Sequence, residues 1–157
     1  MGAIRGQPPV AAGKSVWEVM VVWDNNDESG GWPKEPIVPL ETPYVDERGV
    51  IQNLVEAPMR SAVLITSKKG SVRANHHHKT DWHYCYFLSG AMEYYHRATG
   101  SNAQPERLLV KAGHMVFTPP MVDHAMKFLE DTVFITLSRN ARDHEAYESD
   151  LVQIKLI

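Results

Sequence analysis

The sequence contains very little cysteine and no hydrophobic stretch long enough to cross a membrane. Cys85 is the only cysteine among 157 residues, which excludes an internal disulfide framework and fits a reducing cytoplasm. The longest apolar run near the start, Val19 to Trp23, is far too short to span a bilayer. Residues 1–14 lack the apolar core of a secretion signal. We therefore expect a cytoplasmic protein with no membrane partner.

Positive charge is not in excess either. The chain has 16 Lys and Arg against 19 Asp and Glu, a formal net charge of -3, so it lacks the basic surface that nucleic-acid binding needs. Its 43% hydrophobic and 22% charged residues are ordinary for a globular protein. We expect a partner that is a small molecule rather than a nucleic acid.

Proline separates two parts of the chain. Residues 1–45 are predicted to form an N-terminal extension, with one strand over 15–23 and then a proline-rich connector that excludes a helix. In residues 46–157, short segments rich in β-branched and aromatic residues alternate with Gly, Pro and Asn turns. This texture predicts an all-β sandwich or barrel. The predicted strands are 50–54, 62–66, 72–78, 83–88, 91–96, 108–111, 114–118, 124–128, 132–137 and 151–156, with a helical turn within 139–149.

Histidines are concentrated around residue 80. Because successive side chains of a strand point to opposite faces, His76 and His78 share one face and His77 points away. His83 begins the next predicted strand, and His124 begins a later one. If these strands face each other in a barrel, the imidazoles meet at one point, and neutral imidazole is the commonest protein ligand for transition metals. The alternative is a set of surface histidines in a hydrophilic turn.

The spacing of these histidines resembles the two sequence motifs of the cupin superfamily. The first motif, a glycine followed by His-x-His, an acidic residue and a second glycine, is matched by Gly70, His76-His77-His78, His83 and Gly90. The second is matched by Gly113, Pro119, Met121 and His124. Two residues depart from the pattern: His83 stands in place of glutamate, and Met121 in place of glycine. The resemblance implies a double-stranded β-helix, a jelly-roll barrel, that binds one divalent transition metal (Fe, Mn, Zn, Ni or Cu) through His76, His78, His83 and His124.

A narrower resemblance concerns the residues before the first histidine. The run Arg73-Ala74-Asn75-His76, together with Asp46-Glu47-Arg48-Gly49, is similar to cupin epimerases and isomerases of nucleotide-sugar and capsule-polysaccharide pathways. Those proteins have glycine where this chain has Ala74. In metal-free deoxysugar epimerases of this fold, a histidine near the position of His76 is a base rather than a ligand.

Four further residues are candidates for the chemistry. Asp81 lies beside the predicted ligands and could orient an imidazole or move a proton. One of the adjacent tyrosines 94 and 95 must face inward, and Tyr95 is the candidate acid. Lys79 could hold an anionic substrate. Cys85, two residues from His83, should face the interior as a substrate-contacting thiol or as a small buried apolar residue. Arg73 is predicted to alternate away from the ligand face.

These features leave three hypotheses for function. The first is a metal-dependent enzyme that epimerises or isomerises a sugar or other hydroxy-carbonyl compound. The second is a metal-dependent dioxygenase, which the all-histidine ligand set favours. The third is a non-catalytic cupin that binds a metal or small ligand. The fold alone does not distinguish among these three hypotheses. Exposed strand edges and the predicted strand over 16–23 also lead us to expect a homodimer.

Overall fold

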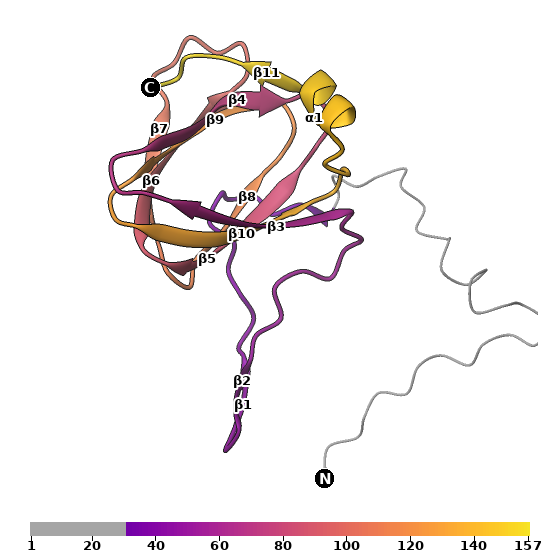
Figure 1. The fold of residues 1–157 in the computed structure, drawn as a ribbon, viewed down its shortest axis with the longest axis vertical. Coiled ribbons are helices and arrows are strands. Elements are labelled where there is room, and N and C mark those ends of the chain that lie inside the picture. The colour runs from indigo at the N-terminus through magenta and orange to yellow at the C-terminus, as the bar shows by residue number, and fades with distance from the viewer. Residues whose placement is uncertain (1–30) are drawn as a thin grey trace, which may run out of the picture. The chain divides into compact units, whose positions relative to one another are not determined.

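The computed structural model describes residues 31–157, and residues 33–157 form one compact unit (Figure 1). The strand predicted over 15–23 lies outside the described residues. Eleven strands and one short helix make up the described part. They are β1 (Tyr44–Asp46), β2 (Gly49–Ile51), β3 (Ser61–Ser67), β4 (Val72–His78), β5 (His83–Ser89), β6 (Ala91–Ala98), β7 (Glu106–Lys111), β8 (Met115–Thr118), β9 (Val122–Phe128), β10 (Thr132–Ser138), α1 (His144–Asp150) and β11 (Leu151–Gln153). No helix of this part is long and apolar enough to cross a membrane.

Two antiparallel sheets face each other and enclose the core (Figure 1). One has the strand order β3-β10-β5-β8 and the other β11-β4-β9-β6-β7. Alternate residues point inward, as β10 shows: Thr132, Phe134, Thr136 and Ser138 are buried and the residues between them are not. The inward aromatic rings pack together, with the ring centroids of Phe87 and Phe134 5.0 Å apart. This core fills one end of the barrel and leaves polar side chains at the other.

The turn between β5 and β6 requires glycine. Gly90 has φ +85°, a conformation that L side chains rarely adopt. A Cβ there would also lie 2.6 Å from the carbonyl oxygen of Asp131 and 2.7 Å from Cα of Thr132. The glycine therefore lets β5 and β6 turn directly beneath the start of β10.

The segment before β1 is part of the barrel unit. The backbone of Phe117 donates to the carbonyl of Pro36 (2.8 Å), and that of Val38 donates to Met115 (2.9 Å). These bonds cover the free edge of β8. The sequence predicted that the barrel begins at residue 46, whereas the compact unit begins at Pro33. The β1–β2 hairpin then projects from the barrel (Figure 1).

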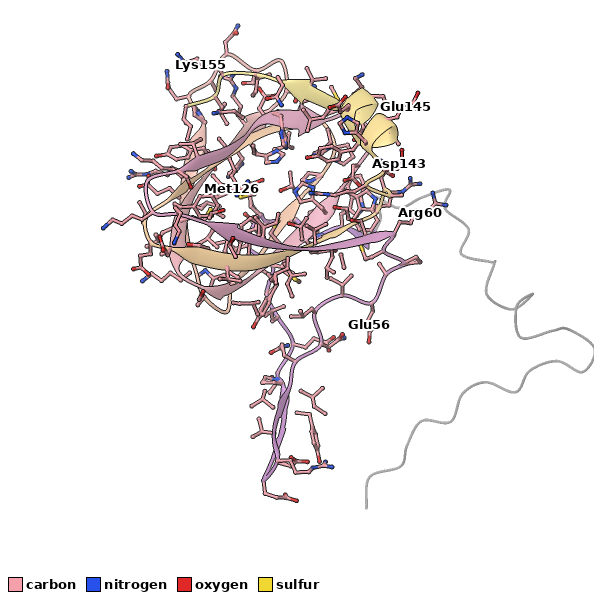
Figure 2. The ribbon with its side chains drawn as sticks, viewed as in Figure 1. Glu56, Arg60, Met126, Asp143, Glu145 and Lys155 are labelled. Carbon is pink, nitrogen blue, oxygen red and sulfur yellow. The ribbon has the colours of Figure 1, made fainter. Side chains whose placement is uncertain are left out.

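Helix α1 lies at one end of the barrel and is followed directly by β11, which pairs with β4 (Figure 1). Asp143 caps the helix, because its carboxylate accepts from the backbone of Ala146 at 3.0 Å. Figure 2 shows Asp143 at this end of the barrel and Met126 between the sheets. The helix therefore covers the polar end of the interior.

Candidate metal centre

Four histidines from three strands meet inside the barrel. We call them the histidine cluster: His76 and His78 on β4, His83 on β5 and His124 on β9. Ring centroids are 4.7 Å apart for His76 and His124, 4.9 Å for His76 and His78, 5.4 Å for His78 and His83, and 5.6 Å for His83 and His124. The four rings line a cavity of about 140 Å³. One ligand atom each from His76, His78 and His124 lies within 4.8 Å of the others, which is close enough to hold one metal ion.

Hydrogen bonds fix the orientation of two of these rings. Nδ1 of His124 donates to the carbonyl of Val122 at 3.0 Å, and Nδ1 of His78 donates to the carboxylate of Asp150 at 3.1 Å. A histidine that donates through Nδ1 keeps a lone pair on Nε2, which is the arrangement typical of metal ligands. The buried Nδ1 of His83 has no hydrogen-bond partner within the described residues 31–157. An orphaned buried nitrogen is costly unless a ligand satisfies it, so the donor set fits a metal ion.

The surroundings keep the cluster uncharged. Burial, with smaller contributions from the neighbouring histidines, lowers the pKa of His76 to about 2. Burial also lowers the pKa of His124 to about 4 and that of His83 well below its ordinary value. For His78, burial lowers the pKa despite the opposing effect of Asp81 and Asp150. Neutral imidazoles have the free lone pairs that a metal ion requires.

A bulge in β4 aligns the histidines. Ala74 pairs with Ala125 and His76 with His124, so Asn75 is an extra residue. Both Ala74 (φ +64°) and Asn75 (φ +56°) are left-handed. The side chain of Asn75 holds this bulge in place by accepting from the backbone of Ile157 at 3.2 Å. Ala74 therefore makes the turn for which the resembling cupins use glycine.

The bulge also corrects the expectation for Arg73. Simple alternation of side chains along β4 predicts that Arg73 points away from the ligand face. The extra residue Asn75 reverses the alternation for the residues that precede it, so Arg73 lines the cavity. Its guanidinium donates to Oγ of Ser67 (2.6 Å) and to the carbonyl of Thr66 (2.9 Å). Among residues 31–157 no carboxylate forms an ion pair with Arg73.

The second cupin-like turn forms without its glycine. Met121 adopts φ +58°, in the left-handed region that glycine would occupy at no steric cost. Its backbone donates to the carbonyl of His78 at 2.8 Å and accepts from Thr99 at 3.0 Å. The turn that leads into His124 is thus tied directly to the strand that carries His78.

Of the other candidates, Asp81 and Cys85 lie at the cluster. Asp81 is buried, and one of its oxygens belongs to a group with His78 and His83 whose ligand atoms lie within 4.8 Å of one another. The backbone of Asn140 donates to Oδ1 of Asp81 at 2.8 Å. Cys85 lines the cavity with its thiol 3.4 Å from Oγ1 of Thr136, and burial raises its pKa to about 11. The thiol is therefore neutral.

Tyr95 and Lys79 lie elsewhere. The hydroxyl of Tyr95 donates to Glu93 at 2.7 Å, and Glu93 pairs with Arg107. The inward residue is Tyr94, which is 1% exposed and hydrogen-bonds Thr118. The catalytic role expected of Tyr95 therefore has no geometric support. Lys79 is exposed, and its ammonium donates to the carbonyl of Ser149 at 2.7 Å, so it caps the end of α1 instead of entering the cavity.

Three residues of the C-terminal segment contribute to the site, and the sequence had singled out none of them. Arg142 and Tyr147 line the cavity, and Asp150 binds His78. Each lies in a stretch with no hydrophobic periodicity, and only the packing of α1 over the barrel brings them to the histidines. The acidic residue that directly follows the predicted helical segment was the one available signal, since metal-binding histidines commonly donate to a carboxylate.

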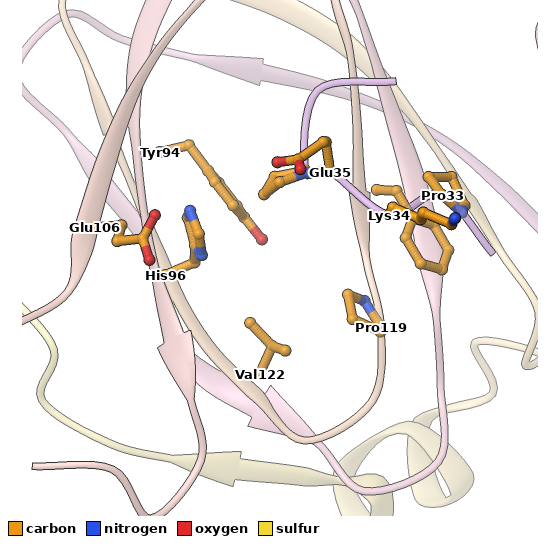
Figure 3. Close-up of a pocket in the computed structure, with 10 residues that line it drawn as sticks. Pro33, Lys34, Glu35, Tyr94, His96, Glu106, Pro119 and Val122 are labelled. Carbon is orange, nitrogen blue, oxygen red and sulfur yellow. The ribbon is translucent and has the colours of Figure 1, made fainter. Parts of the chain in front are cut away.

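A second, larger cavity of about 310 Å³ lies beyond Tyr94. Figure 3 shows Glu35, His96 and Glu106 around it. The ring of Tyr94 lines this cavity and also lies 6.2 Å from the ring of His124, between the two spaces. Within residues 31–157, no group of potential metal ligands includes a residue of this cavity. The larger space is thus separate from the candidate metal centre.

Comparisons with known proteins identify the fold. No protein-family model and no curated protein matches the sequence. Among solved structures, a double mutant of a 3,4-ketoisomerase from Thermoanaerobacterium thermosaccharolyticum, in complex with TDP, is 19% identical with a TM-score of 0.58, over 71% of this chain and 82% of that one. A 3,4-ketoisomerase from Helicobacter canadensis is 15% identical with a TM-score of 0.62, over 74% and 88%.

A third similar structure is a dTDP-6-deoxy-D-glucose-3,5-epimerase from Legionella pneumophila in complex with dTDP-4-keto-L-rhamnose. It is 16% identical with a TM-score of 0.58, over 72% of this chain and 69% of that one. At such identities the likeness shows the fold. The described unit is a cupin-type double-stranded β-helix, which confirms the fold predicted from the sequence.

Proposed function

We propose that this protein is a metal-dependent cupin enzyme that epimerises or isomerises a small hydroxy-carbonyl or sugar-type substrate. One observation carries the proposal: four neutral imidazoles converge on one cavity, and the side chains of His78, His83 and His124 are almost fully buried. Four nitrogen ligands without a compensating carboxylate would leave the full charge of a divalent ion available to a substrate. Perturbed titratable groups gathered in a cavity are typical of functional sites.

His76, His78, His83 and His124 are the proposed ligands. A bound metal would polarise a substrate carbonyl and stabilise the negative charge that develops on its oxygen. Asp150 keeps the ring of His78 in place through its bond to Nδ1. The hydrogen bond to Val122 does the same for His124.

Asp81 is the proposed proton acceptor. The backbone of Asn140 occupies Oδ1, which fixes the carboxylate beside His78 and His83. Asp81 lines a neighbouring space that shares Tyr147 with the cavity of the four rings. From there its Oδ2 would take the proton from the carbon next to the carbonyl, and the same carboxyl would return it. The neutral Cys85 and Met126 form the wall of the cavity and would limit the access of water to the exchanging proton.

The comparisons support the substrate class. The three structures described above bear the names of two 3,4-ketoisomerases and a dTDP-6-deoxy-D-glucose-3,5-epimerase, and two of them hold TDP or a dTDP-linked keto sugar. For this chain, a sugar with a carbonyl group is therefore the first substrate to try. A second candidate function, a metal-dependent dioxygenase, is favoured by the replacement of the usual acidic ligand with His83.

The metal site is tested by elemental analysis of purified protein. We expect close to one transition-metal ion per chain, most of it lost in His83→Ala and in the His76→Ala/His124→Ala double variant. His77→Gln is the matched control, because His77 lies between two proposed ligands in sequence but binds Asp123 on the other face. No metal in the wild-type protein, even after reconstitution, would contradict the proposal and leave His76 as a candidate base of a metal-free epimerase.

The reaction class is tested with the metal-loaded enzyme. Incorporation of deuterium from D₂O into a keto sugar under anaerobic conditions is the result expected for an isomerase or epimerase, and Asp81→Asn should abolish it. Oxygen uptake with enols or diketones, without deuterium exchange, would instead establish the dioxygenase. A metal-loaded protein inactive in both assays would be a binding cupin.

A further inference from the structure

Arg142 brings a positive charge to the histidine cluster. It lies immediately before the cap of α1 and lines the same cavity as the four histidines. Its guanidinium carbon lies 4.9 Å from the centre of the Tyr147 ring, a cation–π contact between two cavity-lining residues. Its charge is among the causes that lower the pKa of His76, His78 and His83. The half-buried guanidinium therefore lies close enough to the cluster to act on it through its charge.

This guanidinium lacks the partners that a part-buried arginine normally has. Nε of Arg142 is buried without a hydrogen-bond partner, and no carboxylate in residues 31–157 forms an ion pair with the side chain. Arginine has five N–H donors, and leaving them unsatisfied away from water is costly. Arg73, the other arginine of the cavity, differs because Ser67 and Thr66 accept from its guanidinium. Arg142 thus has donors to offer to a ligand.

We propose that Arg142 forms a subsite for a small oxyanion, the carboxylate or phosphate of a substrate whose carbonyl end faces the histidine cluster. The planar fork of a guanidinium matches two oxygens of such a group. The cavity of about 140 Å³ is well below the roughly 300–1,000 Å³ of sites that enclose a whole drug-sized ligand. It therefore takes the reacting, charged end of a small molecule. The orientation of the substrate rests on the proposed function, whereas anion binding at Arg142 needs no metal.

Binding of small probes to metal-free and metal-loaded protein tests this subsite. Glycolate and inorganic phosphate are the oxyanion probes, and glycolamide is the neutral analogue of glycolate. We expect calorimetry to show binding of an oxyanion but not of glycolamide to the metal-free protein. In Arg142→Gln this binding should weaken roughly 10- to 100-fold, the loss of a hydrogen bond to a charged group. The preferred probe identifies carboxylate or phosphate as the natural group.

Arg107→Gln is the matched control, since Arg107 pairs with Glu93 on the outer face and should bind probes as the wild type does. Arg142→Lys should retain part of the affinity. The metal content of Arg142→Gln should equal that of the wild type, so that a failure of the subsite and a failure of the metal site remain distinguishable. Unchanged probe affinity in Arg142→Gln, or no oxyanion binding by either form of the wild type, would overturn the subsite.

A measurement on the wild-type chain avoids any folding defect of the variants. Phenylglyoxal modifies accessible guanidinium groups, and peptide mass spectrometry locates them. The bound oxyanion should protect Arg142 and leave the modification of Arg107 unchanged. Equal modification of Arg142 with and without a saturating probe would contradict the proposal.

Discussion

Nδ1 of His78 lies 3.1 Å from Oδ2 of Asp150. The bond joins a strand in the middle of the chain to the last residue of α1, and both groups are buried. The other oxygen of Asp150 accepts from the backbone and hydroxyl of Thr80, at 2.8 and 2.7 Å. The C-terminal helix is thereby fixed to the loop before His83, and Nε2 of His78 is left free for the cavity.

From this relationship we predict that Asp150→Asn weakens metal binding roughly 10- to 100-fold, the usual effect of removing the group that orients a metal-binding histidine. The amide oxygen can still accept from Thr80, but the amide nitrogen cannot accept the proton of His78. A competition titration against a chromophoric chelator measures the affinity. Asp131→Asn is the control, because Asp131 pairs with Lys68 on the exposed surface. Equal affinities of Asp150→Asn and wild type would mean that the bond does not act on a metal site.

The positions of the cluster residues could be predicted from the sequence because they depend on local rules. Strand alternation places His76 and His78 together, and the cupin-like spacing adds His83 and His124. Alternation failed for Arg73, because two residues with positive φ, one of them an alanine, form a bulge that no propensity rule indicates.

Other features of the site depend on contacts between distant segments. Alternation leaves two choices at residues 94 and 95, and only the packing of β6 against β9 turns Tyr94 inward. Arg142 and Tyr147 belong to a polar stretch whose sequence resembles any exposed helix. They reach the cavity because β11 pairs with β4 and carries α1 over the end of the barrel. Tertiary packing of this kind is not encoded in a short window of sequence.

The buried histidines make the metal-free protein sensitive to acid. The pKa values of His76 and His124 fall from 6.5 in a free chain to about 2 and about 4 in the fold. At a pH between the folded-state pKa of each histidine and 6.5, the unfolded chain binds more protons than the folded one. The free energy of unfolding therefore decreases as pH falls below 6.5. Above that pH both states are deprotonated and these groups cause no change.

Urea denaturation of the chelated protein at several pH values measures this effect. We expect the midpoint to be constant from about pH 7.5 to 8.5 and to fall steadily below 6.5. A His76→Gln/His124→Gln variant should show a shallower fall, because two of the responsible groups are gone. A wild-type midpoint independent of pH down to 5 would contradict the assignment of neutral, buried histidines.

Substitution of Gly90 by alanine, compared with the same substitution at Gly100, distinguishes the effect of a steric clash from that of backbone strain. We predict that Gly90→Ala destabilises the fold by roughly 1–3 kcal/mol or more, because the new Cβ would both require a positive φ and meet the backbone of Asp131 and Thr132. Gly100→Ala is the matched control: Gly100 has φ +82° but no atom within 4 Å of such a Cβ. Thermal unfolding should show a larger decrease in Tm for Gly90→Ala. Equal decreases would mean that the turn relaxes and only the backbone conformation matters.

The β1–β2 hairpin is the surface that we expect to form a homodimer. Tyr44, Val45, Val50 and Ile51 expose between 60% and 66% of their surface, and Val45 pairs directly with Val50. A two-stranded hairpin has little stability by itself, and exposed apolar groups of this size favour a partner surface. The dimer is a proposal, and static light scattering tests it.

We predict that the wild-type chain has the mass of a dimer and that Val45→Lys/Val50→Glu has the mass of a monomer. The opposite charges of this variant face each other across the two strands and should preserve the hairpin, so that only the apolar contact is lost. Leu109→Thr, which removes an exposed apolar side chain from β7, should remain dimeric.

A monomeric wild type would contradict the dimer. A dimeric hairpin variant would instead show that the interface lies on another face, such as the one that carries the exposed Leu64 on the edge strand β3. Since the hairpin is remote from the histidine cluster in the fold, the monomeric variant should bind metal as the wild type does.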